Sequence, residues 1–206
     1  MTLRAWLPVA VIAATAMITA AAPEARKVLF IGNSLTVANN LPQTVEHLSA
    51  AIGDPIAATV VAFPDFSLSD HWDKGDALAA IRRGGWAVVV LQQGPSSVPE
   101  SRALLIADTR RFDSEIRKYG GRTALFQVWP PRGREMFAAD VSRSYADAAK
   151  AVGGLLLPAG DAWRAAFRDD PLATLYGPDQ FHPSQAGSAL AARVIVETIT
   201  GKKLSR

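Results

Sequence analysis

Short apolar runs rich in β-branched residues alternate with segments of helical composition along most of this chain. The apolar runs are Val28 to Ile31, Ile56 to Ala62, Trp86 to Leu91, Thr123 to Val128 and Leu155 to Leu157. Segments with helical spacing lie between and after them, at Leu41 to Ile52, Asp76 to Arg83, Ser101 to Tyr119, Glu135 to Val152 and Ser184 to Thr200. Near-continuous apolar strands are typical of a parallel sheet that helices cover on both faces. The alternation predicts one α/β domain with a doubly wound, mainly parallel five-stranded sheet and right-handed crossovers.

The N-terminal segment departs from this pattern. One early charge, Arg4, precedes a run of apolar and small residues from Ala5 to Ala22, and charge returns at Glu24. This order is typical of a secretory signal peptide, so we predict a leader over residues 1–22, a mature domain over 23–206, and an exported, periplasmic or secreted protein. The alternative is an uncleaved N-terminal anchor, because the run is close to the lower length for a membrane span. After cleavage we expect no membrane span.

Composition narrows the chemistry further. The 22 Lys and Arg residues against 19 Asp and Glu give a net charge of only +3, and the basic pairs are scattered rather than gathered in a stripe. We therefore expect no nucleic-acid partner. The chain has no cysteine, which excludes a thiolate nucleophile, a thiolate metal site and a disulfide framework. Phosphate-loop, dinucleotide-binding and zinc-protease motifs are absent, so we expect neither a cofactor nor a metal.

In a parallel sheet, the loops after the carboxyl ends of the strands converge on a crevice where ligands bind. The polar segments that the pattern brings to this edge are Ser34, Asp65 to Trp72, Gln92 to Ser97, Trp129 to Arg134 and the turn before the last helix. Residues far apart in the sequence thus become candidates for one site.

Ser34 closes the first apolar run in VLFIGNSLT. A turn directly after a buried strand can present a hydroxyl to the crevice and leave backbone N–H groups free, which suits a nucleophile. The alternative is a serine that caps the following helix. The segment does not match the G-x-S-x-G elbow of α/β-hydrolases, because Leu35 and Thr36 follow the serine.

His182 lies in DQFHPSQAG, three residues after Asp179 and just before the last predicted helix. This spacing allows the carboxylate to hold one ring nitrogen while the other faces the crevice, as a general base requires. The alternative is a helix-entry histidine beside a surface aspartate. Of the other histidines, we expect His47, inside a predicted helix, to lie on the surface or to fill the core. We expect His71 to make a structural hydrogen bond rather than to line the site.

Four ordered blocks, GNSLT, FSLSDHW, VVVLQQGPSS and DQFHPSQAG, resemble those of the SGNH, or GDSL-type, hydrolase superfamily over about residues 28 to 200. The two end blocks are specific and the two middle blocks are weak. The resemblance implies a three-layer α/β/α sandwich with flavodoxin-like strand order. It also implies a serine nucleophile, a histidine base and an aspartate three residues before it, which fall here on Ser34, His182 and Asp179.

The family resemblance also implies an oxyanion hole of three donors: the nucleophile's N–H, a glycine N–H in the second block and an asparagine side chain in the third. Ser34 supplies the first. The best match to the glycine is Asp65, and the third block has Gln93, with Gln92 as the alternate. Some sugar-acetylesterase branches resemble this chain in using a Gln-Gly pair there. A carboxylate near a developing oxyanion is unfavourable unless it points away, and the alternative for the glutamines is that they cap a strand end.

A further segment, Trp129 to Arg134, combines an aromatic residue with two prolines and two arginines at the same edge. It is either a sugar-binding or anion-binding wall or a rigid turn with solvated charge, and we expect the turn.

The function we expect is an exported serine esterase that cleaves a small acyl ester through an acyl-enzyme, with an O-acetyl group on a carbohydrate as one candidate. Its partner is then a small-molecule or glycan ester substrate. The alternatives are a lysophospholipase or thioesterase acting on longer acyl chains, and a non-catalytic binding protein that kept the fold.

Overall fold

The computed structural model describes residues 23–205, so the predicted leader lies outside the described residues. Its centre is a five-stranded sheet in which every pairing is parallel. The strand order is β2-β1-β3-β4-β5, which confirms the predicted doubly wound, flavodoxin-like sheet. The strands are β1 (Arg26–Gly32), β2 (Ile56–Ala62), β3 (Val88–Leu91), β4 (Arg122–Phe126) and β5 (Leu155–Leu157).

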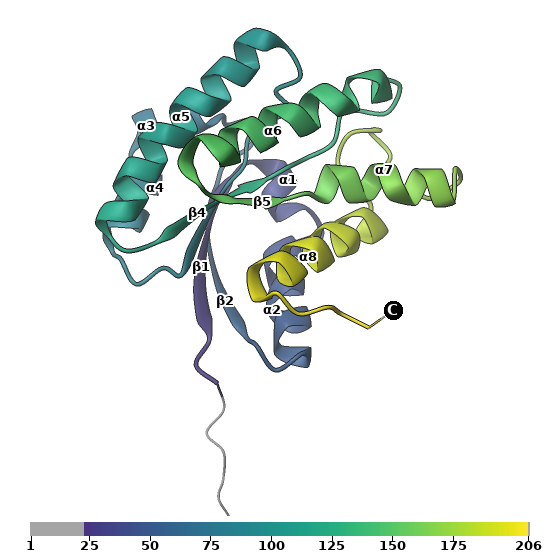
Figure 1. Cartoon of the computed structure of the whole chain (residues 1–206). Coiled ribbons are helices and arrows are strands. Elements are labelled where there is room, and N and C mark those ends of the chain that lie inside the picture. The colour runs from purple at the N-terminus through teal and green to yellow at the C-terminus, as the bar shows by residue number, and fades with distance from the viewer. Residues whose placement is uncertain (1–22, 206) are drawn as a thin grey trace, which may run out of the picture.

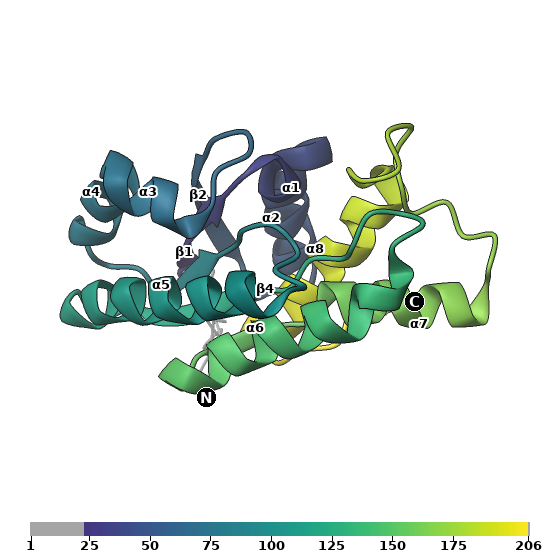
Figure 2. The same ribbon diagram turned by 90° about the horizontal axis from the view of Figure 1, so that it is seen from above.

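Helices cover both faces of the sheet and make the three-layer sandwich (Figure 1). One layer holds α3 (Leu68–Lys74), α4 (Asp76–Arg82), α5 (Pro99–Lys118) and α6 (Ala138–Val152). In the other layer α2 (Leu41–Ala51) packs against α8 (Gln185–Thr200), and α7 (Ala159–Asp169) lies beside α8. Seen from above, α5 and α6 lie side by side, with α2 and α8 behind them (Figure 2). Two short helical turns, α1 (Ser34–Val37) and η1 (Ala38–Asn40), connect β1 to α2, and a third, η2 (Glu135–Phe137), precedes α6.

The middle strands are apolar on both faces because both faces are buried. All four residues of β3 are buried, and in β1 the five residues from Val28 to Gly32 are buried. Burying such strands stabilises the fold by about 25 cal/mol for each Å² of apolar surface removed from water. The sheet therefore gives a rigid base on which the loops at its carboxyl edge are held.

Two helices were not predicted from the sequence. Helix α3 has seven residues, too few for a helical period to show clearly. Helix α7 carries Gly160 in its first turn, which weakens a helical pattern. A side chain at position 160 would collide with the carbonyl oxygen of Val128, so the glycine allows the helix to start against the chain that leaves β4.

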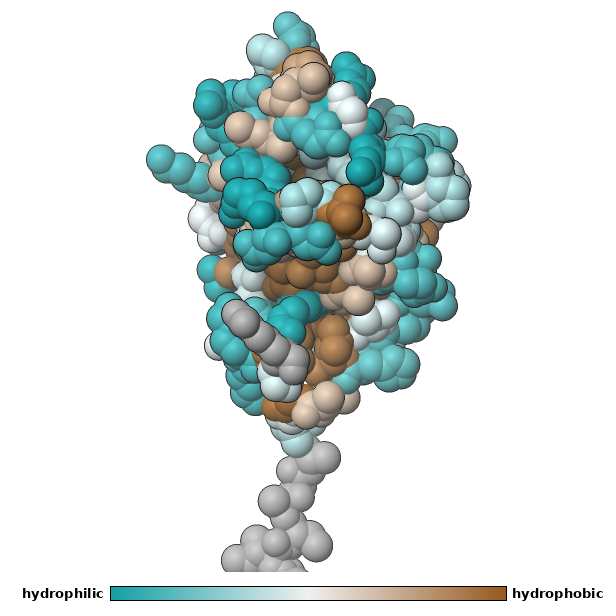
Figure 3. All heavy atoms as spheres, turned by 90° about the vertical axis from the view of Figure 1, so that its right-hand side faces the viewer, coloured by the Kyte–Doolittle hydropathy of each residue, from teal (hydrophilic) through white to brown (hydrophobic). Residues whose placement is uncertain are grey.

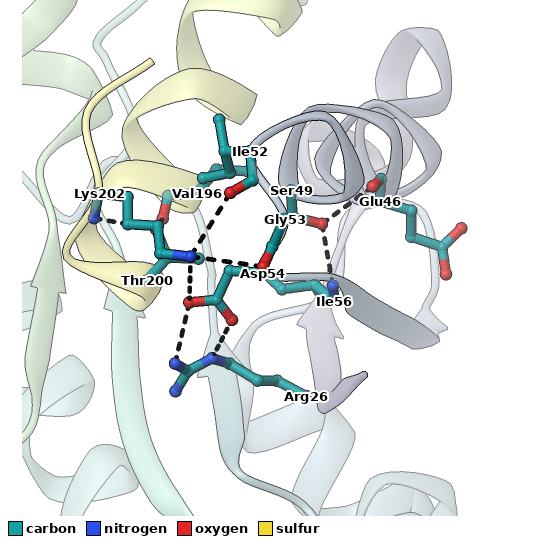
Figure 4. Close-up of polar contacts among 10 residues, drawn as sticks. All are labelled: Arg26, Glu46, Ser49, Ile52, Gly53, Asp54, Ile56, Val196, Thr200 and Lys202. Atoms are coloured by element: carbon teal, nitrogen blue, oxygen red, sulfur yellow. Dashed lines mark hydrogen bonds and ion pairs between the residues drawn. The ribbon is translucent and has the colours of Figure 1, made fainter. Parts of the chain in front are cut away.

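A polar network closes the opposite, amino-terminal edge of β1 (Figure 4). The guanidinium of Arg26 donates to both oxygens of Asp54, at 2.7 and 3.0 Å. Lys202, just after α8, lies 3.7 Å from the same carboxylate and donates to the carbonyls of Ile52 and Gly53. The guanidinium of Arg26, with its hydrogen bonds, holds the pKa of Asp54 below its usual value. The network ties the C-terminal end of α8 to the turn between α2 and β2.

Over residues 23–205, none of the helices combines the length and the apolar character that a bilayer span requires.

Candidate active site

The first and last of the four sequence blocks meet at the carboxyl edge of the sheet. Ser34 is the first residue of α1, directly after β1, and His182 lies in the turn before α8. The Oγ atom of Ser34 is 2.8 Å from Nε2 of His182, although 148 positions separate the two residues. The right-handed crossovers return the chain to this edge at its end, and so bring the hydroxyl and the imidazole together.

Asp179 completes a series of three groups. Its Oδ2 atom is 2.5 Å from Nδ1 of His182, while its Oδ1 atom accepts the backbone N–H groups of Phe181 and His182 at 3.1 and 2.9 Å. The hydrogen bond to His182, with those from the backbone, lowers the pKa of the Asp179 carboxyl to about 2. An ionised carboxylate at Nδ1 places the ring proton there and leaves Nε2 as the acceptor for the Ser34 hydroxyl.

Neighbouring backbone holds the turn that carries these two residues. The carbonyl of His182 accepts the N–H of Gly177 at 2.7 Å, which closes the turn on itself. From the loop after β4, the indole N–H of Trp129 donates to the carbonyl of Phe181 at 3.1 Å, and the N–H of Arg132 donates to that of Gln180 at 2.8 Å. The loop after β4 thus sets the position of the imidazole.

The loop that carries Ser34 is held from below by Gln92. The Oε1 atom of this completely buried side chain accepts the N–H of Asn33 at 2.9 Å and the hydroxyl of Thr36 at 2.6 Å. Its amide N–H₂ donates to the carbonyl of Gln93 at 2.6 Å. A methyl group on Gly32 would lie against Thr36 Oγ1 and 2.5 Å from Gln92 Oε1, so only glycine fits. Gln92 therefore lies beneath the serine loop and not in the hollow beside it.

His71 supports the same loop. Its ring is completely buried, and Nε2 lies 2.7 Å from the carbonyl oxygen of Gly32. Since a carbonyl only accepts, Nε2 carries the proton, and the buried Nδ1 has no partner among the described residues. Burial lowers the pKa of His71, against the opposing effect of the bond to Gly32 and of Asp70 and Asp76. This contact is structural, as the sequence led us to expect.

A hollow of about 390 Å³ opens beside Ser34. Gln93, nearly buried, lines it: Oε1 accepts the N–H of Leu68 at 3.1 Å, and the amide N–H₂ donates to Ser96 Oγ at 2.9 Å. An amide N–H₂ has two hydrogens, so one remains for a ligand. Of the two glutamines considered, Gln93 is the one at the hollow.

Asp65 also lines this hollow, at the position where the family resemblance places glycine. Its backbone is left-handed, with φ of 60°, a conformation that glycine adopts freely and that aspartate tolerates better than most residues. Within residues 23–205 its N–H donates no hydrogen bond. The carbonyl of the next residue, Phe66, accepts from the side chain of Asn33 at 3.1 Å, which ties this loop to the serine loop.

Sequence reasoning missed the side chains from α5 that complete the hollow. Asp108 is nearly buried, and its carboxylate accepts the hydroxyl of Ser69 at 2.5 Å and the guanidinium of Arg111 at 3.0 Å. Ser101 and Leu104, on the same helix, line the hollow with Asp108. Their spacing of three and four residues places them on one face of α5, which is the signal that the sequence offered.

The segment after β4 has two parts with different roles. Trp129 is buried and stacks on Trp163, with ring centroids 3.6 Å apart and planes 8° from parallel, so most of this side chain belongs to the core. Arg132 and Arg134 reach the surface, and Arg134 lies over the ring of Phe137. His47, on α2, contributes nothing to the hollow beside Ser34.

Across residues 23–205, no group of three or more His, Cys, Asp and Glu side chains is arranged to hold a metal ion.

Comparison with solved structures finds the same architecture elsewhere. A protein from Slackia heliotrinireducens, described as an SGNH hydrolase, is 28% identical with a TM-score of 0.74, over 85% of this chain and 100% of that one. A DUF4886 family protein from Bacteroides uniformis is 18% identical with a TM-score of 0.72, over 87% and 84% of the two chains. An acetyl xylan esterase from Geobacillus stearothermophilus is 17% identical with a TM-score of 0.67, over 88% and 97%.

No family model matches the chain, and no curated protein matches it. The structural similarity nonetheless covers 85% or more of this chain in all three comparisons. The resemblance seen in the sequence is confirmed: this chain has the fold of the SGNH, or GDSL-type, hydrolase superfamily.

Proposed function

We propose that this protein is an exported serine esterase that removes a small acyl group, with an O-acetyl group on a carbohydrate as the substrate. The observation that carries the proposal is a series of two hydrogen bonds beside an open hollow. Ser34 Oγ lies 2.8 Å from His182 Nε2, and His182 Nδ1 lies 2.5 Å from Asp179 Oδ2. A hydroxyl, an imidazole and a carboxylate in this order are the parts of a nucleophilic triad.

Acylation begins when the Ser34 oxygen attacks the ester carbonyl and His182 Nε2 takes the hydroxyl proton. Asp179, ionised because its pKa is lowered to about 2, holds the Nδ1 proton and stabilises the imidazolium that forms. The imidazolium then gives its proton to the departing alcohol. The products of this half-reaction are the free alcohol and an acyl group on Ser34.

The developing oxyanion needs donors that are already in place. Ser34 is the first residue of α1, so its N–H has no acceptor within that helix. We assign the second donor to the N–H of Asp65 and the third to the free amide hydrogen of Gln93. Each such donor lowers the barrier by about 3 kcal/mol in comparable sites.

In deacylation, water is the nucleophile and the Ser34 oxygen is the leaving group. His182, neutral again, takes a proton from a water molecule, whose oxygen attacks the acyl carbon. The carboxylic acid leaves when the Ser34 oxygen recovers its proton from the imidazolium.

The hollow beside Ser34 combines polar and apolar side chains. Its polar residues include Ser67, Ser69, Ser96, Ser101, Asp65 and Asp108, whose groups can form hydrogen bonds with sugar hydroxyls. Phe66, Pro95, Leu104 and Phe181 supply its apolar part. The polar part supports a sugar ester as the substrate, and the apolar part is what the longer-chain alternative would use.

Labelling with a fluorophosphonate tests the catalytic part. We expect the mature protein to be modified and the Ser34→Ala variant to remain unmodified, because only an activated serine reacts. Equal labelling of the two proteins, or no labelling of either, would refute a serine hydrolase. Turnover of acetyl and octanoyl chromogenic esters tests the acyl length, and a strong preference for octanoyl favours the lysophospholipase or thioesterase alternative.

Export rests on the N-terminal sequence. The test is to measure the mass of the protein in the exported fraction. We expect a mass that corresponds to cleavage near residue 22. Recovery of the full-length chain in the membrane fraction would instead support the uncleaved anchor.

A further inference from the structure

A second and larger cavity lies away from Ser34. Its volume is about 480 Å³, and it lies between the loop after β4, helix α7 and the segment that leads toward the turn of His182. None of Ser34, Asp179 and His182 lines it. The face of the molecule that carries α7 shows hydrophobic side chains among hydrophilic ones (Figure 3).

The charge of this cavity is positive. Arg132, Arg164 and Arg168 line it against one acidic residue, Glu135. Arg164 pairs with Asp161 at 3.6 Å, whereas Arg132 and Arg168 make no ion pair within residues 23–205. Two guanidinium groups without a carboxylate partner at the wall of a concave site favour an anionic ligand, and a planar carboxylate fits their paired N–H groups.

Aromatic rings form part of the apolar lining. Phe167 and Tyr176 stack with ring centroids 5.9 Å apart, and both line the cavity. The hydroxyl of Tyr176 donates to the carbonyl of Pro130 at 2.7 Å, so this ring is fixed against the loop after β4. Immobile aromatic rings at a cavity wall offer an apolar surface to the C–H face of a sugar ring at low entropic cost.

A third, smaller hollow has lining residues in common both with this cavity, called here the arginine cavity, and with the hollow beside Ser34. That hollow shares Pro130 with the arginine cavity, and it shares Phe181, Ser96 and Ser101 with the hollow beside Ser34. Phe181 directly precedes His182, so a ligand that crosses it passes the catalytic turn. An extended ligand that reaches both the arginine cavity and Ser34 would run along this shared lining.

We propose that the arginine cavity is a subsite for the carboxylate of an acidic sugar. The substrate is then an acylated oligosaccharide that carries a uronate several sugar units away from the scissile ester. This inference rests on the proposed function. Arg132 and Arg168 bind the carboxylate, Phe167 and Tyr176 contact the ring, and Ser34 attacks the acyl group at the other end.

Kinetics with three esters test the proposal: p-nitrophenyl acetate, an acetylated neutral xylo-oligosaccharide, and an acetylated xylo-oligosaccharide with a glucuronate side group. For the double variant Arg132→Gln/Arg168→Gln, we expect kcat/KM on the glucuronate ester to fall at least about tenfold relative to that on p-nitrophenyl acetate, because charge-assisted hydrogen bonds are lost. The matched control is Arg83→Gln/Arg110→Gln, which removes two exposed charges elsewhere on the surface. This control should leave the ratio of kcat/KM on the glucuronate ester to kcat/KM on p-nitrophenyl acetate as it is in the wild type.

Binding separates this inference from the catalytic proposal. Calorimetric titration of the Ser34→Ala protein with the glucuronate oligosaccharide should show binding that weakens with salt and is lost when both arginines are replaced. Equal affinity for the neutral oligosaccharide, or an unchanged ratio of kcat/KM in the double variant, would overturn the subsite and leave the esterase standing. Absence of p-nitrophenyl acetate turnover in the wild type would refute the esterase itself, while the titration still reports on the cavity.

Discussion

Asp179 lies three positions before His182 and holds its ring through a 2.5 Å contact between Oδ2 and Nδ1. The other carboxylate oxygen accepts two backbone N–H groups of the same turn. The backbone therefore orients the carboxylate, which in turn orients the imidazole. Although both side chains are well exposed to solvent, their relative position is fixed locally and needs no distant contact.

Replacing the carboxylate with an amide should remove catalysis without disturbing the fold. We expect Asp179→Asn to lower kcat on p-nitrophenyl acetate by about 10³- to 10⁴-fold, because an amide N–H₂ selects the wrong ring tautomer and does not stabilise the imidazolium. Asp73→Asn, at a position of α3 outside the hollow, is the matched control. A loss below tenfold would mean that Asp179 does not orient the base.

The same carboxylate makes a pH-dependent contribution to stability. Its folded pKa of about 2 lies below the ordinary value of 3.8, so the contribution is present above pH 4 and is lost as pH falls toward 2. Urea unfolding should show the wild type approaching Asp179→Asn in stability over that window. A constant difference between the two proteins from pH 5 to pH 2 would contradict the lowered pKa.

His71 should make the fold sensitive to weak acid. Its folded pKa is lowered from 6.5 by burial, so its contribution is complete above pH 6.5 and is lost as pH falls through the lowered folded value. His71→Gln keeps a donor near the Gly32 carbonyl and cannot titrate. We expect its free energy of unfolding to vary less with pH below 6.5 than that of the wild type. Parallel curves would show that the pKa of His71 is the same in the folded and the unfolded protein.

Gly32 has space for no side chain. In Gly32→Ala the methyl group would press on Thr36 and Gln92, so we expect a loss of about 1–3 kcal/mol in unfolding free energy and a displaced Ser34 with reduced kcat. Gly94→Ala is the matched control for stability, because a methyl group there meets no atom within 4 Å. Equal stability of the two variants would mean that the serine loop adapts easily.

The two glutamines after β3 should separate catalysis from folding. Gln93→Ala removes a proposed oxyanion donor, so kcat should fall about 10²- to 10³-fold. It also leaves the N–H of Leu68 without its acceptor, which should cost about 1–3 kcal/mol of stability. Gln92→Ala leaves the N–H of Asn33 and the hydroxyl of Thr36 without their buried acceptor and should cost about 2–4 kcal/mol of stability. Chemical unfolding together with kcat distinguishes the two effects, and the reverse assignment would follow if Gln92→Ala stayed stable but inactive.

Local patterns in the sequence were enough for the sheet and for the candidate triad. Strands such as Val88–Leu91 are apolar throughout because both faces of the sheet are covered, so an unbroken apolar run is itself the sign of a buried strand. The spacing of Asp179 and His182 matters within one turn, where sequence distance and spatial distance are nearly the same. The order of the strands came from the family resemblance, because strand–helix alternation and right-handed crossovers fit more than one order.

Tertiary structure alone decided which side chains share a surface. Gln92 and Gln93 are adjacent in sequence, yet the pleat of the strand exit directs one beneath the serine loop and the other to the hollow. Asp108 reaches the same hollow from α5, and Arg132 and Arg168 meet at a cavity across 36 positions of chain. These meetings depend on helix placement over the sheet, a sum of many weak packing contacts that no short stretch of sequence encodes.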